Sequence, residues 1–282
     1  MKNIITILFL AFCQFANAFW YTDFKEAKKI ALASNKLLIV DFYADWCGPC
    51  KKMDYDSWDN ALVVDVLSTS YIKVKVDIDS EKGLANQYNI SSIPNMYILD
   101  FTGKEIHNFS GYHDANQLKR ELEKFAYSTE FVQNESVVFS KNQDCNNAMQ
   151  LALKYLDYSC YLPQDIRKNF VRLGEKYLTD ARKLNNPKGN DFAYNKEKID
   201  LLNLFQFAYL GNFDKLKKKL LKIDSKSIDA GNLQYLHFLQ LMVAKSEKND
   251  DDVEKILVEA QKNGDFKYYS EKAGVLISKI QS

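Results

Sequence analysis

The chain has 282 residues, which is long for a single domain and suits two. Its 38 basic and 37 acidic side chains balance, so the composition lacks the basic excess typical of proteins that bind nucleic acids or membrane surfaces. We therefore expect no nucleic-acid partner. Hydrophobic residues make up 46% of the chain, which is enough to form buried cores and excludes a disordered protein.

Segment 1–18 has the three parts of an export signal. Lys2 supplies a positive charge, an almost unbroken apolar run extends from Ile4 to Cys13, and the small residue Ala18 ends the segment. We predict a signal peptide cleaved after Ala18, with the mature chain in the periplasm or secreted. An uncleaved anchor is the alternative, although the run is roughly half the length of a membrane-spanning helix. A lipoprotein signal at Cys13 is disfavoured because the bulky Phe12 precedes it.

Residues 19–127 alternate between strand and helix patterns. The apolar run Leu37–Tyr43 is typical of a strand buried on both faces, and Tyr71–Ile78 alternates as strands do. Further strands are predicted at 95–100 and 105–110, and helices at 23–33, from Cys47 onward, at 59–67, 81–88 and 114–127. This order predicts an α/β layer fold with parallel pairing in its first half.

From about Ser128 the pattern changes. Residues 128–143 are polar and mixed, and we predict a linker there. Helices are predicted at 146–157, 164–184, 196–210, 213–223, 233–248, 253–262 and 267–280. Short breaks rich in Asn, Gly and Pro separate them and favour antiparallel hairpins. We therefore expect residues 144–282 to form an all-α helical-hairpin domain.

The chemistry is predicted at Cys47-Gly48-Pro49-Cys50, directly after the first strand. A thiol attacks a disulfide as the thiolate, and the N-terminus of a helix stabilises negative charge. Cys47 lies at such an N-terminus, so its pKa should be lowered and it is the expected nucleophile. Cys50 lies one turn later and, more deeply buried, is the expected resolving thiol. Pro49 suits the first turn of a helix.

Asp41 is the candidate for proton transfer. It lies within an apolar strand, where burial would raise its pKa and let it exchange a proton with Cys50 through water. The alternative is a purely structural role, but an isolated buried carboxylate is costly. A zinc site would need four ligands, and the sequence has no second C-x-x-C and no H-x-x-x-H, so we expect no metal and no cofactor.

These motifs resemble the thioredoxin superfamily over about residues 20–127. The resemblance rests on Trp46 before C-G-P-C, on Asp41 in the preceding strand, on Lys75 and on Ile93-Pro94 after a helix. It implies a redox disulfide between Cys47 and Cys50, Lys75 as a modulator beside Asp41, and a cis Ile93–Pro94 bond. The residues that would contact substrate are Trp46, Gly48, Pro49, Ile93 and Pro94. Asn95 departs from the family, which usually has Thr after the proline, and this bears on substrate preference.

Together these features predict an exported thiol–disulfide oxidoreductase that reduces or isomerises protein disulfides. The C-G-P-C spacer resembles reducing members of the superfamily. Reduction in an oxidising compartment needs an electron donor, and we expect a membrane thiol-transfer protein. Two alternatives stay open: a disulfide oxidase of the same fold, and a helical binding or scaffold protein with an auxiliary thioredoxin domain. A homodimer through the helical domain is a further hypothesis.

The remaining cysteines of the mature chain, Cys145 and Cys160, leave two alternatives open. A straight helix between them would separate the two by roughly 22 Å, which is too far for a disulfide. They can bond only if the helix breaks near Tyr158-Ser159 and the chain turns back. Otherwise they are two buried free cysteines.

Overall fold

The computed structural model describes residues 19–262, 264 and 266–281. The predicted signal peptide over 1–18 lies outside the described residues. The chain divides into two compact units, with the division between Gln133 and Asn134. No helix among the described residues is long and apolar enough to cross a membrane.

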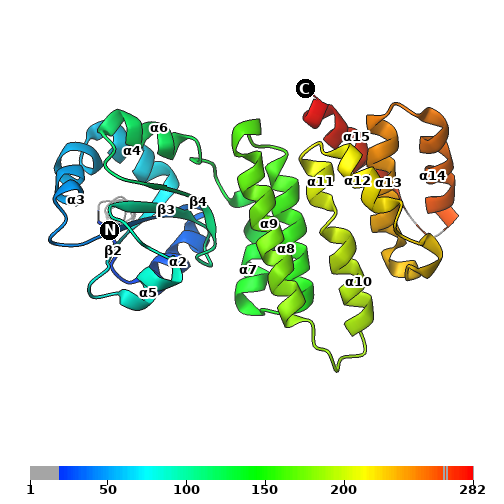
Figure 1. Cartoon of the computed structure of the whole chain (residues 1–282), viewed down its shortest axis with the longest axis horizontal. Helices are drawn as coiled ribbons and strands as arrows, with labels where there is room; N and C mark the ends of the chain where they lie inside the picture. The colour runs from blue at the N-terminus through cyan, green and yellow to red at the C-terminus, as the bar shows by residue number, and fades with distance from the viewer. Residues whose placement is uncertain (1–18, 263, 265, 282) are drawn as a thin grey trace, which may run out of the picture. The chain divides into compact units, whose positions relative to one another are not determined.

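The first unit contains a four-stranded mixed sheet (Figure 1). Its strands are β1 (Leu37–Tyr43), β2 (Tyr71–Asp77), β3 (Asn95–Leu99) and β4 (Glu105–Ser110), in the order β2-β1-β3-β4. β1 and β2 pair in parallel, whereas β3 is antiparallel to both of its neighbours. The predicted parallel pairing in the first half of the domain is confirmed.

Helices cover both faces of this sheet. They are α2 (Phe24–Ser34), α3 (Gly48–Met53), α4 (Ala61–Ser70), α5 (Lys82–Gln87) and α6 (Ala115–Glu123). In Figure 1, α4 and α6 lie on one face, and α2 and α5 lie on the other. The central strand β1 is therefore buried on both sides, which explains its unbroken apolar sequence. Its residues Leu38, Val40 and Phe42 are fully buried within the main hydrophobic cluster.

The helix predicted from the cysteine pair through Met53 is present as α3. It passes directly into η1 (Asp54–Trp58), a short π-helix that the sequence did not predict. A π-helix adds a residue to the turn and changes the direction of the side chains that follow. Here it contributes two residues, Asp54 and Trp58, to the surroundings of Asp41.

The second unit is helical throughout its described residues, as the sequence predicts. Its helices are α7 (Gln133–Lys141), α8 (Cys145–Ser159), α9 (Gln164–Leu184), α10 (Phe192–Leu202), α11 (Phe205–Tyr209), α12 (Phe213–Leu220), α13 (Leu233–Ser246), α14 (Asp250–Lys262) and α15 (Lys267–Gln281). Several helices adjacent in sequence pack together, most extensively α8 with α9. The single helix predicted over 196–210 is two helices, α10 and α11, interrupted at Asn203 and Leu204.

The segment 128–143, expected to be a linker, is largely helical. It contains the 3-10 helix η2 (Glu130–Val132) and all of α7. Val132 and Phe139 are buried, and the Thr129 N–H donates to the Asn35 carbonyl in the first unit. Few apolar residues among many polar ones are enough for a helix that buries one narrow face, and the division between the two units falls within this segment.

Candidate active site

The two cysteines lie where β1 passes into α3. Cys47 is the N-cap of α3, with extended backbone angles, and Pro49 is in the first turn. The Cys50 N–H donates to the Cys47 sulfur over 3.2 Å. In the reduced protein the same N–H would stabilise a thiolate on Cys47, because unpaired N–H groups at a helix start favour negative charge.

Cys47 and Cys50 form a disulfide, with Cα atoms 5.3 Å apart. The expected difference in burial between them is absent, since the side chains are 4% and 3% exposed. In the oxidised protein both sulfurs therefore lie just below the surface. They form a small apolar cluster with Ala44, against which Ile93 packs.

The rim of the site combines an exposed ring and a cis peptide bond. Trp46 is 68% exposed, and its indole N–H donates to the Asp79 carboxylate over 2.8 Å. The Ile93–Pro94 bond is cis, as the family resemblance implies. Gly48 has no neighbouring atom within 4 Å of where a Cβ would stand, so this corner of the site is open. An open rim with an immobilised aromatic ring suits contact with a protein segment.

Asp41 lies in the middle of β1 and is 2% exposed. Burial raises the pKa of this carboxyl to about 6, although Lys75 acts in the opposite direction. The nearby charge of Asp54 adds to the increase in pKa. The indole N–H of Trp58, which is also buried, interacts with this carboxyl and, like Lys75, acts to lower its pKa. Asp41 is therefore a carboxyl poised to take up or release a proton near neutral pH.

Lys75 lies between two carboxylates. It is paired with Asp41 in the register of β1 and β2, and its ammonium is 3.4 Å from Asp41 Oδ2. The same ammonium is hydrogen-bonded to Asp54 Oδ1. It also lies over the rings of Tyr43 and Trp20, at 4.9 Å and 5.4 Å from their centroids. The lysine is thus shared, and Asp41 receives only part of its stabilising charge.

Sequence reasoning located Cys47, Cys50, Asp41 and Lys75 but missed Asp54. A signal was present, because Asp54 lies four residues after Cys50, the spacing of side chains on one helix face. The sequence could not show that this face turns toward Lys75, since the π-helical turn is not predictable from the residues.

The other two cysteines lie at opposite ends of one helix. Cys145 is the first residue of α8 and Cys160 is its C-cap, and both are buried and free. Burial raises the pKa of both thiols, that of Cys160 to about 11. α8 runs without a break from Cys145 to Ser159, so the two cysteines stay a helix length apart and the disulfide alternative is not realised. Among the described residues no group of three His, Cys, Asp or Glu side chains is placed to hold a metal ion.

A mixed sheet with a redox-active disulfide at the start of a helix defines a thioredoxin-type redox domain. The thioredoxin family model matches residues 20–124. The chain is 32% identical over 107 residues to the thioredoxin-like protein slr0233 of Synechocystis sp., which covers 36% of this chain and 94% of that protein. It is 35% identical over 100 residues to the chloroplastic thioredoxin Y of Oryza sativa, covering 36% of this chain and 57% of the relative. The chain belongs to the thioredoxin family.

A further similarity concerns a larger protein. Protein disulfide-isomerase of Datisca glomerata is 32% identical over 133 residues, which cover 42% of this chain and 26% of the relative. The chain therefore spans only about half of the rice thioredoxin Y and about a quarter of this isomerase. The match to the family model ends at residue 124, before the helical unit begins.

Proposed function

We propose that this protein is an exported thiol–disulfide oxidoreductase that reduces or isomerises disulfides in protein substrates. One observation carries the proposal: the Cys47–Cys50 disulfide lies at the start of α3, beside Ile93 of the cis peptide bond. The similarity to thioredoxins and to a protein disulfide-isomerase supports this class of activity. Protein substrates are favoured by the open rim at Gly48 and the exposed Trp46.

The cycle begins with the reduced pair. The Cys47 thiolate attacks one sulfur of the substrate disulfide, so a Cys47–substrate bond forms, the substrate S–S bond breaks, and the released thiolate takes a proton. The Cys50 thiol then gives up its proton and attacks the Cys47 sulfur. The second substrate thiolate leaves and is protonated. The substrate has gained two electrons, and the Cys47–Cys50 disulfide has formed.

Asp41 is the proposed acceptor of the Cys50 proton. A carboxylate with a pKa near 6 is mostly ionised at neutral pH, yet it is a much stronger base than an ordinary Asp. In the reverse direction the protonated Asp41 would return the proton to Cys50 as the disulfide is reduced. Lys75 modulates this exchange because it stabilises the ionised form of Asp41.

Before the next cycle, a donor that carries two thiols must reduce the Cys47–Cys50 disulfide. We propose a membrane thiol-transfer protein, because export through the signal predicted at residues 1–18 would separate the protein from cytosolic reductants. The expected location is the periplasm, or the medium if the protein is secreted.

We also propose a homodimer through the helical unit, supported only by that unit's size. Sedimentation that gives a monomer at micromolar concentration would exclude it.

The test is acid-quenched thiol trapping of Cys47 and Cys50 in cells that express the full chain. A pair that is mostly reduced means that a dedicated donor maintains it, as the reductase or isomerase function requires. A pair that is mostly oxidised replaces this proposal with a disulfide oxidase of the same fold. Cys145 and Cys160 are internal references, because both are buried and free.

Two matched variants test whether the thiol chemistry is the function at all. Cys50→Ser stops the cycle after the first attack, so it should accumulate mixed disulfides with its substrates through Cys47. Cys47→Ser lacks the nucleophile and should form none. If the cellular role of the protein survives in Cys47→Ser, the helical unit is the working part, and the scaffold alternative is correct.

A further inference from the structure

A hollow in the helical unit follows one entire face of α10. It has a volume of about 700 Å³ and is closed on the other side by the end of α12 and the segment that follows it. Seven residues of the α10 side line it, spaced as one face of a helix: Phe192, Ala193, Lys196, Glu197, Asp200, Leu201 and Leu204. Since α10 has 11 residues, the groove is about 16 Å long.

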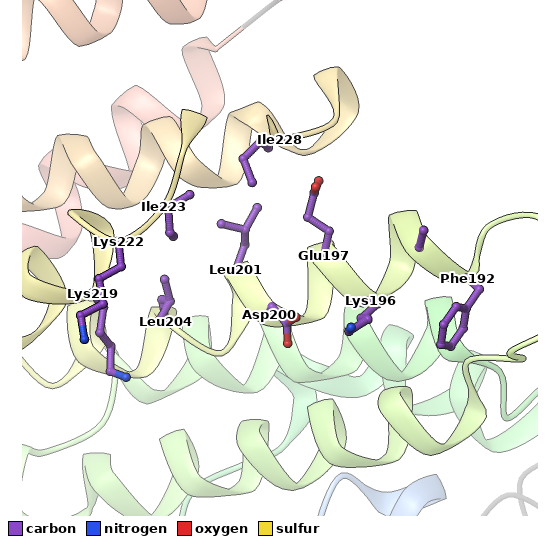
Figure 2. Close-up of a pocket in the computed structure, with 11 residues that line it drawn as sticks. Phe192, Lys196, Glu197, Asp200, Leu201, Leu204, Lys219, Lys222, Ile223 and Ile228 are labelled. Carbon is purple, nitrogen blue, oxygen red and sulfur yellow. The ribbon is translucent and has the colours of Figure 1, made fainter. Parts of the chain in front are cut away.

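The floor of this groove is apolar, and no element of the described part of the chain covers it. Figure 2 shows Leu201 and Leu204 pointing toward Ile223 and Ile228 across the hollow. Leu204, Ile223 and Ile228 are only partly buried, although each faces other apolar side chains. A helix face of this kind normally packs against another helix, and an unfilled one marks a binding surface.

The acidic and the basic side chains around the groove differ in whether other groups of the protein pair with them. Glu197 accepts hydrogen bonds from the Asp229 N–H and the Asn232 side chain, at 3.0 Å and 2.8 Å. Asp200 pairs with Arg182 over 2.7 Å. Both acids of the groove are thus engaged by the protein itself.

The basic residues of the groove are not paired in this way. Lys196, Lys219 and Lys222 are exposed, and none forms a salt bridge with a carboxylate in the part of the chain that the structure describes. Lys219 and Lys222 lie at one end of the groove and Lys196 lies toward the other (Figure 2). A ligand that lies along the groove would therefore meet positive charge near both ends.

We propose that this groove binds an amphipathic helix of a partner protein, about three turns long, with an apolar face and acidic residues near both ends. The apolar face would cover Leu201, Leu204 and Ile223, and its carboxylates would pair with the lysines. The length of the groove favours a helical peptide over a compact small molecule, which would leave one end of it empty. The proposal does not depend on the redox function.

The probe is a fluorescein-labelled amphipathic peptide with leucines at helical spacing and glutamates at the remaining positions. Two further versions replace every glutamate with glutamine or with lysine. We expect fluorescence anisotropy with the full chain to give affinities in the order glutamate, glutamine, lysine. The difference between the first and last should be at least tenfold at low salt and should shrink as salt is added. Equal affinities would overturn the proposal.

Charge reversal in the groove gives the second test. The double variant Lys196→Glu/Lys222→Glu should bind the glutamate peptide at least tenfold more weakly and prefer the lysine peptide. The control Lys168→Glu/Lys262→Glu has the same change in net charge at exposed positions outside the groove and should bind like the parent chain. If the control loses affinity equally, the attraction is only that of net charge, and the proposed site is wrong.

Discussion

At the scale of single residues, Asp41 decides much of the behaviour of the site. Its carboxyl is 2% exposed in an apolar strand, and its ionic partner, Lys75, is shared with Asp54. The pKa of Asp41 is raised from 3.8 to about 6. A carboxyl so placed costs stability when it is ionised, and that cost is consistent with a functional reason for retaining it.

The first prediction concerns stability and pH. Because the pKa of Asp41 is higher in the folded than in the unfolded protein, the folded state binds more protons between about pH 4 and pH 6. Stability should therefore decrease as pH rises through that window, by up to about 3 kcal/mol. Asp41→Asn removes this dependence, so in urea denaturation of the oxidised protein it should be more stable than the parent chain at pH 7.5 but not at pH 4. A gain of the same size at both pH values would contradict this.

The second prediction concerns Asp54. This carboxylate holds the Lys75 ammonium partly away from Asp41 and adds a like charge nearby, and both effects raise the pKa of Asp41. Asp54→Asn should therefore lower the pKa of Asp41, measured by NMR titration of its side-chain carboxyl carbon in the oxidised protein. Asp56→Asn, an exposed position two residues away, is the matched control and should leave that pKa nearly unchanged. An unchanged pKa in Asp54→Asn would show that the lysine does not move between the two carboxylates.

At the scale of elements, the packing of α8 against α9 depends on how closely the two helices approach as well as on their amphipathic pattern. Gly174 in α9 faces α8, and a Cβ there would lie 3.1 Å from the Ala152 carbonyl oxygen and 3.1 Å from the Leu156 Cγ. Backbone and a buried branched side chain cannot easily move away, so only glycine lets the two helices pack this closely.

The third prediction compares two glycines in helix interiors. Gly174→Ala should destabilise the protein by about 1–3 kcal/mol, because overpacking outweighs the gain in helix propensity. Gly274→Ala in α15 is the matched control, since no atom lies within 4 Å of its Cβ position, and it should be neutral or stabilising by up to about 1 kcal/mol. The measurement is the urea denaturation midpoint of each variant, compared with that of the parent chain. If both variants change stability in the same direction, packing at Gly174 is not limiting.

At the scale of the whole molecule, the chain divides into two compact units. The first unit has a hydrophobic cluster built from α2, the sheet and the segments between them. The Thr129 N–H also ties the end of this unit back to Asn35. The first unit thus has what a domain needs to fold alone.

The fourth prediction follows from this division. A fragment of residues 19–133 should fold cooperatively and keep a Cys47–Cys50 pair that can be reduced and reoxidised. Circular dichroism with urea tests folding, and insulin reduction with an external thiol donor tests the pair. The same fragment with Cys47→Ser is the control and should lack activity. A fragment that is unfolded at 25 °C would show that the helical unit contributes to the stability of the first.

Features that depend on neighbouring residues were predictable from the amino-acid sequence. The apolar run of β1, the helical spacing after residue 143 and the C-G-P-C motif are local patterns, and they predicted the fold class and the cysteine pair. Lys75 and Pro94 were located only through resemblance to a family, because nothing near them in the sequence shows what they face.

Tertiary structure alone decided the features that depend on distant residues. The π-helical turn brings Asp54 to Lys75, the helix α7 forms in a segment of polar composition, and the unfilled face of α10 becomes a groove. Each depends on which surfaces pack together and on how a charge is shared among groups far apart in the chain. Packing and electrostatics act through space, so a local pattern in the sequence does not contain them.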